Sequence, residues 1–265
     1  MPRVSSTHNP RLQQAMRLVA SSRDRRKAGR CVLEGEHLVS VYLARVGSPE
    51  LLIVVAERMD DPALQAIAAQ MPPADVLIVP MLIFAQLAVL PAAIGVLAVV
   101  ATPRGAVPAP RRFHVLLEDV HDPGNVGTIL RTAAAAGVEQ VLLSKHCAFA
   151  WAPKVLRAAQ GAHFFTAIVE NVELASWARQ FRARGGQVAA TVANCGQNLY
   201  TSILRAPLAI AIGNEGNGLT QSLLDAVDAK VTIPMPGGME SLNASAAAAI
   251  TVFEAVRQGV AASPK

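Results

Sequence analysis

The stretch FHVLLEDVHDPGNVGTILRTAAAAG, residues 113–137, determines the predicted fold class. The apolar run Phe113–Leu117 predicts a buried strand, and the apolar and alanine-rich residues Val126–Ala136 predict a helix. A proline and two glycines at positions 123–127 shape the turn between them. A strand that passes through a turn into a helix is the repeating unit of an α/β fold.

The same alternation continues toward the end of the chain. Further helices are expected at Pro153–Ala159, Val172–Arg184, Ser222–Val227 and Leu242–Gln258. Further strands are expected at Gln140–Leu143, Phe164–Val169, Val188–Val192, Leu208–Ile212 and Val231–Ile233. The strands are apolar throughout rather than at every second position, which indicates burial on both faces and a mainly parallel sheet between helical layers.

Residues 1–103 predict a smaller α/β/α domain. Its helices are expected at Asn9–Lys27, at Glu36–Arg45 and from Asp61-Pro62 onward. Its strands are expected at Cys31–Leu33, Leu51–Val55, Val76–Val79 and Val96–Val100. Residues 104–112 are rich in proline and arginine, the composition of a linker, so we assign 1–103 and 113–265 as two domains.

Positive charge is concentrated near the N-terminus. Residues 1–30 contain eight Lys or Arg and one acid, a net +7, whereas the whole chain carries +5. Such a segment favours RNA or another polyanion as partner, because each phosphate contact by Lys or Arg releases counterions. The alternative is a solvated basic helix face. Aromatic residues are only 4% of the chain, so base stacking on an aromatic platform is not expected.

The composition argues against a disordered or membrane-spanning chain. Hydrophobic residues make up 52% and charged residues 16%, which is enough for a sizeable core. The most apolar run, Val76–Val100, is interrupted by prolines, a glutamine and a glycine, so it cannot supply the roughly 20 apolar residues of a spanning helix. Neither a signal peptide, a disulfide framework nor a metal-binding spacing is expected, and we expect a cytoplasmic protein.

Three glycine-rich strand exits indicate the functional site, because ligands of open α/β sheets bind at the carboxyl ends of strands. The first exit carries Asn125 and Arg131, which at six residues apart can converge on one point. The second, LAIAIGNEGNGL (208–219), brings an acid and three glycines to a strand end. The third, IPMPGGMESLNASAAAA (233–249), offers Ser241 or Asn243 as a helix cap. Each exit alone also fits an ordinary βα turn.

Together the three exits resemble the SpoU/TrmH branch of the SPOUT superfamily. The motif N-x-G-x-x-x-R is present in the first exit, G-x-E-x-x-G in the second, and I-P-M followed by S-L-N in the third. The matching residues are Asn125, Gly127 and Arg131, then Gly213, Glu215 and Gly218, then Ile233–Met235 and Ser241–Asn243. The resemblance covers residues 113–259, and residues 1–103 resemble a ribosomal-protein-like RNA-binding domain.

Members of this family are RNA ribose 2′-O-methyltransferases that use S-adenosylmethionine, work as homodimers and carry a C-terminal trefoil knot. The resemblance implies that Arg131 stabilises the developing ribose alkoxide, since a guanidinium is not readily deprotonated. It implies that Asn125 orients Arg131 or the ribose, that Ser241 and Asn243 hold the target nucleotide, and that Glu215 fixes the glycine loop. Arg131 would serve either its own cofactor or that of the partner subunit.

The resemblance also indicates the binding residues. The cofactor is expected to contact Thr191, Gly213, Asn214, Gly216, Gly218, Ile233, Met235 and Leu242. RNA is expected to contact the basic segment at Arg11, Arg23, Arg25, Arg26, Lys27 and Arg30. The last helix is the expected dimer contact. Large-subunit ribosomal RNA is the preferred substrate, and transfer RNA is the alternative.

Two other classes of function are consistent with parts of the pattern. One is an RNA-binding protein without turnover, against which the intact Asn125, Arg131, Glu215 and Asn243 argue. The other is a nucleotide- or phosphate-binding enzyme on an ordinary doubly wound sheet, against which the lack of a Walker lysine and of G-x-G-x-x-G argues.

Overall fold

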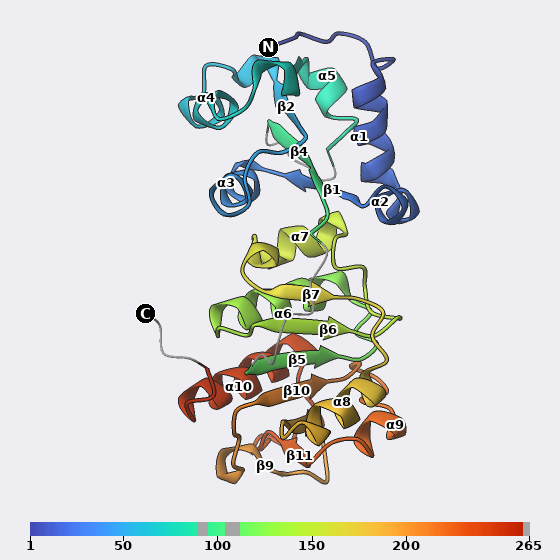
Figure 1. Ribbon diagram of the computed structural model, residues 1–265, viewed down its shortest axis with the longest axis vertical. Helices are drawn as coiled ribbons and strands as arrows, with labels where there is room; N and C mark the ends of the chain where they lie inside the picture. Colours follow the sequence, from blue (N-terminus) through green and yellow to red (C-terminus); the bar gives the residue numbers. More distant parts are fainter. Residues whose placement is uncertain (89–94, 104–111, 262–265) are drawn as a thin grey trace. The chain divides into compact units, whose positions relative to one another are not determined.

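A computed structural model describes residues 1–88, 95–103 and 112–261, which form two compact units (Figure 1). The first unit contains Met1–Pro103 together with Trp151–Phe164, and the second contains the other described residues. All of the linker expected at residues 104–112 except Arg112 lies outside the described residues.

The sequence-based division differs from the structure at Trp151–Phe164, which was expected in the second domain. This segment forms α7 (Pro153–Ala159) and the 3₁₀ turn η3 (Ala162–Phe164). It belongs to the first unit, where the ring of Phe164 meets Tyr42 of α3 edge-on with centroids 5.3 Å apart. Phe164, the first residue of the expected strand Phe164–Val169, is the last residue of η3, and the strand itself begins at Ala167.

The first unit is the predicted α/β/α layer structure. Its strands are β1 (Arg30–Glu34), β2 (Leu51–Val55), β3 (Val76–Val79) and β4 (Val96–Ala101), in the order β1-β4-β2-β3. Strand β4 is antiparallel to β1 and β2, and β2 is parallel to β3. Its other elements are α1 (Pro10–Ala20), α2 (Ser22–Ala28), α3 (Glu36–Arg45), η1 (Ala56–Arg58), α4 (Pro62–Ala69), η2 (Pro73–Asp75) and α5 (Met81–Phe84).

The single helix expected at Asn9–Lys27 is in fact two helices, α1 and α2. The chain is extended at Ser21, whose hydroxyl accepts a hydrogen bond from the Asp24 amide at 3.1 Å and caps α2. The side chain of Arg25 turns back and donates to the carbonyl oxygens of Leu18 and Val19 at 2.5 and 3.0 Å. These bonds satisfy carbonyls at the end of α1 that have no partner within the helix.

The second unit is built on a seven-stranded sheet in the order β7-β6-β5-β10-β8-β11-β9, in which every pair is parallel. Its strands are β5 (Phe113–Leu117), β6 (Gln140–Leu143), β7 (Ala167–Val169), β8 (Gln187–Thr191), β9 (Gln197–Asn198), β10 (Leu208–Ile212) and β11 (Ala229–Thr232). Its other elements are α6 (Pro123–Ala135), α8 (Leu174–Ala183), η4 (Leu199–Thr201), α9 (Gln221–Leu224) and α10 (Ala244–Arg257). The predicted parallel sheet is confirmed.

Helices cover both faces of this sheet (Figure 1). One face forms a core with α8 and α9, in which Val188 and Ala190 of β8 take part. Thr191 points to the opposite face, because successive strand residues alternate, and its hydroxyl donates to Thr251 of α10 at 3.4 Å. Helix α10 therefore lies across the sheet from α8.

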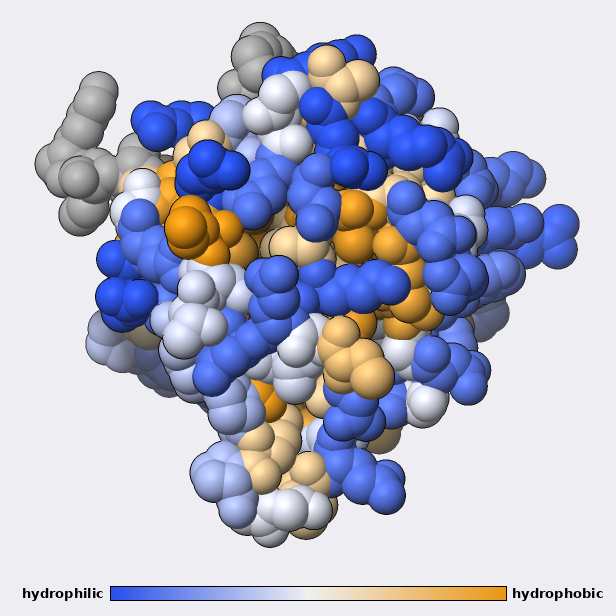
Figure 2. All heavy atoms as spheres, turned by 90° about the horizontal axis from the view of Figure 1, so that it is seen from below, coloured by the Kyte–Doolittle hydropathy of each residue, from blue (hydrophilic) through white to orange (hydrophobic). Residues whose placement is uncertain are grey.

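The surface at the β9 end of the second unit carries separate apolar areas among polar side chains (Figure 2). Exposed large apolar residues of this unit include Tyr200, Ile203, Met239 and Phe253. Among the described residues, no helix is long and apolar enough to cross a membrane.

Candidate functional site

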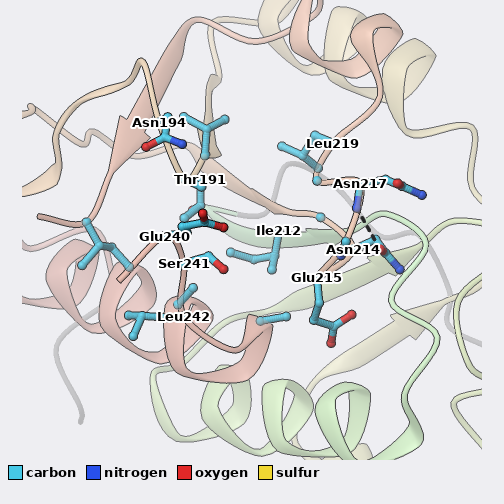
Figure 3. Close-up of a pocket in the computed structure, with 18 of the residues that line it drawn as sticks. Thr191, Asn194, Ile212, Asn214, Glu215, Asn217, Leu219, Glu240, Ser241 and Leu242 are labelled. Carbon is cyan, nitrogen blue, oxygen red and sulfur yellow. Dashed lines mark hydrogen bonds between the residues drawn. The ribbon is translucent and has the colours of Figure 1, made fainter. Parts of the chain in front are cut away.

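A cavity of about 720 Å³ opens where β8, β10 and β11 end (Figure 3). Its lining comes from the segment after β8, the loop after β10, the turn after β11 and the first turns of α10. All eight residues expected to bind the cofactor line it. The second and third strand exits of the sequence therefore meet at one cavity, because their strands are joined through β8 in one sheet.

The loop after β10 approaches itself closely enough to require glycine at Gly213. A Cβ atom there would lie 2.4 Å from the carbonyl carbon and 2.5 Å from the carbonyl oxygen of Gly218. Gly218 itself has a φ of +66°, a conformation that glycine adopts without strain. These two glycines fold the loop into a narrow turn against the cavity.

Asn214 shapes the loop through its side chain rather than offering that side chain to a ligand. Its Oδ1 accepts hydrogen bonds from the amides of Gly216 and Asn217 at 2.8 and 3.1 Å, and Figure 3 shows the second of these. Its Nδ2 donates to the carbonyl oxygen of Asp119 at 2.9 Å. Asn214 lines the cavity, yet both polar atoms of its side chain are engaged within the protein.

A chain of side-chain hydrogen bonds joins the three strand exits. Asn125 Nδ2 donates to Glu215 Oε1, and Asn125 Oδ1 accepts from Asn243 Nδ2 at 3.0 Å. Asn243 also caps α10, because its Oδ1 accepts from the Ser245 amide at 2.9 Å. Glu215 points from the cavity toward α6 in Figure 3, consistent with its bond to Asn125. Three of the five predicted catalytic residues are thus brought into contact.

The other two predicted catalytic residues lie apart from this chain. Ser241 lines the cavity. Arg131 is exposed on α6 and does not line the cavity. Because α6 begins at Pro123, Asn125 and Arg131 are on one helix, about 9 Å apart along its axis and about 120° apart around it. The two side chains therefore leave α6 on different sides, and their convergence on one point stays a prediction.

Sequence reasoning missed several residues of the cavity wall. They include Glu240, which adjoins Ser241, Asn194, which lies three residues after Thr191, and Leu219, Ala244 and Ala247. These residues belong to no recognisable sequence motif, so no signal in the sequence points to them. They are assigned to the site only because the cavity extends beyond the motif residues.

The thiol nearest the first exit is a structural group. Cys147 donates to the Leu117 carbonyl oxygen at 3.2 Å, and burial raises the pKa of its thiol. It is therefore held as a neutral hydrogen-bond donor rather than a thiolate nucleophile. Among the residues that the structure describes, no three His, Cys, Asp or Glu side chains gather as a metal site.

The basic segment of the first unit is only partly available to a ligand. The expectation that Arg25 contacts RNA is wrong, because its side chain is only 5% exposed and its guanidinium caps the end of α1. Burial also lowers the pKa of Arg25. Arg11 pairs with Asp75 at 3.0 Å and Arg30 with Glu50 at 2.5 Å. The exposed cations of α2 are Arg23, Arg26 and Lys27.

A second cavity, of about 450 Å³, lies between α1 and α2. Arg17 and Lys27 line it together with Gln14 and Asp24. Arg17 was counted in the basic segment but not among the expected RNA contacts. The cleft gives the first unit a concave surface with two cations, one carboxylate and an amide.

Comparison with known proteins gives a consistent family. The model of the SpoU rRNA Methylase family matches residues 112–253. An uncharacterized tRNA/rRNA methyltransferase of Synechocystis is 32% identical over 98% of this chain and 95% of its own. The 23S rRNA (guanosine(2553)-2′-O)-methyltransferase RlmP of Bacillus subtilis is 31% identical over 96% of this chain and 98% of its own.

Solved structures share the whole architecture. The SpoU methyltransferase AviRb of Streptomyces viridochromogenes, in complex with AdoMet, has a TM-score of 0.84 and 27% identity, covering 96% of this chain and 99% of that one. An AdoMet-bound rRNA methyltransferase of Sinorhizobium meliloti has a TM-score of 0.84 and 28% identity, covering 96% and 97%. Both units are therefore present in these relatives.

Proposed function

The chain belongs to the SpoU rRNA methylase family, and we propose that it transfers a methyl group from S-adenosylmethionine to a ribose 2′-hydroxyl of large-subunit ribosomal RNA. The observation that carries this proposal is the meeting of the second and third motifs at one cavity, to which the Glu215–Asn125–Asn243 chain of hydrogen bonds joins the first motif. Transfer RNA is the second candidate substrate, since the Synechocystis relative is named for both RNAs.

The cavity suits S-adenosylmethionine in shape and charge. The close turn at Gly213 lets a ligand lie against backbone, and Ile212, Leu219 and Ile233 supply apolar wall for an adenine ring. Glu240 places a carboxylate in the lining, which complements a positively charged ligand. When bound, this cofactor supplies an electrophilic methyl group on a sulfonium.

The residues of the chain would act by alignment and charge stabilisation. Transfer to a hydroxyl is an in-line displacement, for which holding the two reactants in line provides much of the rate. Ser241 and Asn243 would hold the target nucleotide beside the cavity. The permanent charge of Arg131 would stabilise the developing alkoxide, while the proton leaves to water or an RNA phosphate.

We infer that the active form is a homodimer in which Arg131 serves the partner's cavity. In support, Arg131 is exposed and does not line the cavity of its own chain. Helix α10 begins at that cavity and exposes Phe253 farther along, so the helix that borders the site also offers an apolar contact. In such a shared site, Arg131 of each chain would reach the cofactor in the partner's cavity.

We also propose that the first unit binds RNA. Its support is the net +7 of residues 1–30, with exposed cations on α2 and the cleft of Arg17 and Lys27 between α1 and α2. The family further leads us to propose the C-terminal trefoil knot, a division into substrate-binding and catalytic domains near residues 103 and 113, and a cytoplasmic location.

The test is methyl transfer by the purified full chain from S-adenosylmethionine with a tritiated methyl group. Unmodified 23S rRNA, 16S rRNA and transfer RNA are supplied separately. We expect label in 23S rRNA, at a ribose that becomes resistant to alkaline cleavage. Label only in transfer RNA would favour the second candidate.

Calorimetry with S-adenosylmethionine and with ATP accompanies the assay. Cofactor binding without transfer to any RNA would indicate a non-catalytic RNA-binding protein. Binding of ATP but not of S-adenosylmethionine would indicate a nucleotide-binding enzyme and would refute the proposed reaction.

A further inference from the structure

Two consecutive residues after β5 hold both ends of the loop that follows β10. Glu118 accepts two hydrogen bonds from Thr220, from its amide to Oε2 at 2.7 Å and from its hydroxyl to Oε1 at 2.9 Å. The carbonyl oxygen of Asp119 accepts from Asn214 Nδ2 at 2.9 Å. Asn214 and Thr220 lie at the two ends of this loop. In the sequence the loop follows β5 by about 100 residues.

The direction of the Asp119 carbonyl depends on an unusual backbone conformation. Asp119 has a φ of +55°, in the left-handed region that non-glycine residues rarely adopt. Ser144, just after β6, holds it there: the Asp119 amide donates to Ser144 Oγ at 2.9 Å, and Ser144 Oγ donates to Asp119 Oδ1 at 2.6 Å. The end of β6 thus supports the contact that the end of β5 makes with Asn214.

Neither Glu118 nor Asp119 lines the cavity, whereas the loop they hold supplies seven consecutive lining residues, Gly213–Leu219. Glu118 is only 9% exposed, so its charge-assisted bonds to Thr220 are largely shielded from water. A loop with several glycines has many accessible conformations, and ordering it before the ligand arrives removes an entropic cost from binding.

We propose that Glu118 and Asp119 are positioning residues for cofactor binding, which act through Thr220 and Asn214 to keep the glycine loop in its binding shape. This inference rests on the proposed function, in that the cavity is taken to bind S-adenosylmethionine. It adds a role for the end of β5 that the three motifs do not include.

The test compares loop order with cofactor affinity. Glu118→Ala removes both bonds to Thr220. Thr220→Val removes the hydroxyl bond to Glu118 together with the 3.4 Å bond by which that hydroxyl caps α9 at the Leu223 amide, and it does so at an exposed residue that is not needed for the core. In cofactor-free protein, both variants should exchange the amide hydrogens of Gly216 and Asn217 faster than the unaltered chain. Calorimetry should show S-adenosylmethionine affinity lowered about tenfold or more in Glu118→Ala.

Matched variants separate positioning from general destabilisation. Thr220→Ser keeps the hydroxyl and should retain the exchange rates and affinity that Thr220→Val loses. Glu57 is a carboxylate of the first unit that accepts from the Met81 amide at 3.0 Å, so Glu57→Ala removes a comparable bond far from the loop in sequence. It should leave exchange at Gly216 and Asn217 unchanged.

The inference is overturned if Glu118→Ala and Thr220→Val exchange the loop amides and bind S-adenosylmethionine like the unaltered chain. Equal losses in Thr220→Ser and Thr220→Val would also overturn it, because the hydroxyl would then be irrelevant. If the unaltered chain does not bind S-adenosylmethionine, the proposed function fails, while hydrogen exchange still decides whether the end of β5 orders the loop.

Discussion

Replacing Gly213 by alanine tests whether the loop after β10 must fold back on itself to form the cofactor cavity. The added Cβ would lie 2.4, 2.5 and 2.7 Å from the Gly218 carbonyl carbon, the Gly218 carbonyl oxygen and the Leu219 nitrogen. Ordinary contact begins at 3.4 Å, and all three atoms belong to backbone. No change of rotamer can relieve the clash, so the loop must move by about 1 Å.

The expected loss of cofactor affinity follows from the cost of overpacking. Forcing an extra methyl group into a closely packed site costs about 1–3 kcal/mol, which corresponds to an affinity roughly 5- to 150-fold lower if the cost falls on the bound conformation. Titration calorimetry of S-adenosylmethionine into the unaltered chain and into Gly213→Ala measures this loss directly. Thermal unfolding of both proteins shows whether the fold is retained.

Gly237→Ala is the matched control. Gly237 lies in the third strand exit, outside the cavity lining, and a Cβ there would meet nothing within 4 Å. The affinity of the Gly237→Ala variant for S-adenosylmethionine should stay within about twofold of the affinity of the unaltered chain. Unchanged affinity in Gly213→Ala, or an equal loss in Gly237→Ala, would refute the reasoning.

Three further predictions concern the dimer, the RNA and pH. Arg131→Ala should abolish methyl transfer and keep cofactor affinity. Mixed with an equal amount of Gly213→Ala under subunit exchange, and assayed at an S-adenosylmethionine concentration too low to fill the Gly213→Ala cavity, it should recover about a quarter of the activity. The reason is that half of the dimers are mixed and each mixed dimer has one intact site. No recovery would place Arg131 at its own chain's cavity. Changing the exposed cations Arg23, Arg26 and Lys27 of α2 to alanine should reduce the slope of log RNA affinity against log salt concentration by about 0.9 per lost phosphate contact. The variant Arg25→Ala should chiefly lower the melting temperature. An unchanged slope in the first variant would favour a solvated helix face that does not contact RNA. Hydrogen bonds from Arg257 and Gln258 lower the pKa of Glu254 to about 2. The stability that these bonds provide should therefore be present above the ordinary glutamate pKa and be lost as the pH falls toward 2. The melting temperatures of the unaltered chain and of Glu254→Gln should accordingly converge at low pH.

Local patterns predicted the elements well where short-range chemistry decides them. The apolar runs at Phe113–Leu117, Gln140–Leu143 and Leu208–Ile212 are strands over those same residues, because a fully buried parallel strand is a continuous apolar run. Asp61 caps α4 and Pro62 is its first residue, as the dipeptide predicts. Element ends were less certain, since α6 begins three residues earlier than its apolar pattern indicates.

The tertiary structure decided which cations of the basic segment face solvent and which are buried within the protein. Arg25 looks like any other cation of the basic segment, yet the break at Ser21 turns it inward to the carbonyls at the end of α1. No local pattern distinguishes it from Arg23 or Arg26, because the difference lies in which way the side chain faces after α1 and α2 pack together.

The sequence by itself determined the fold class, the family and the three segments that form the site, because runs of apolar residues and glycine-rich turns act over a few positions. Only the tertiary structure decided which polar side chains meet there. Asn125 and Glu215 are 90 residues apart, and Glu118 and Thr220 are 102 apart. They are brought together because β5 and β10 are paired side by side, a long-range contact that no short stretch of sequence encodes.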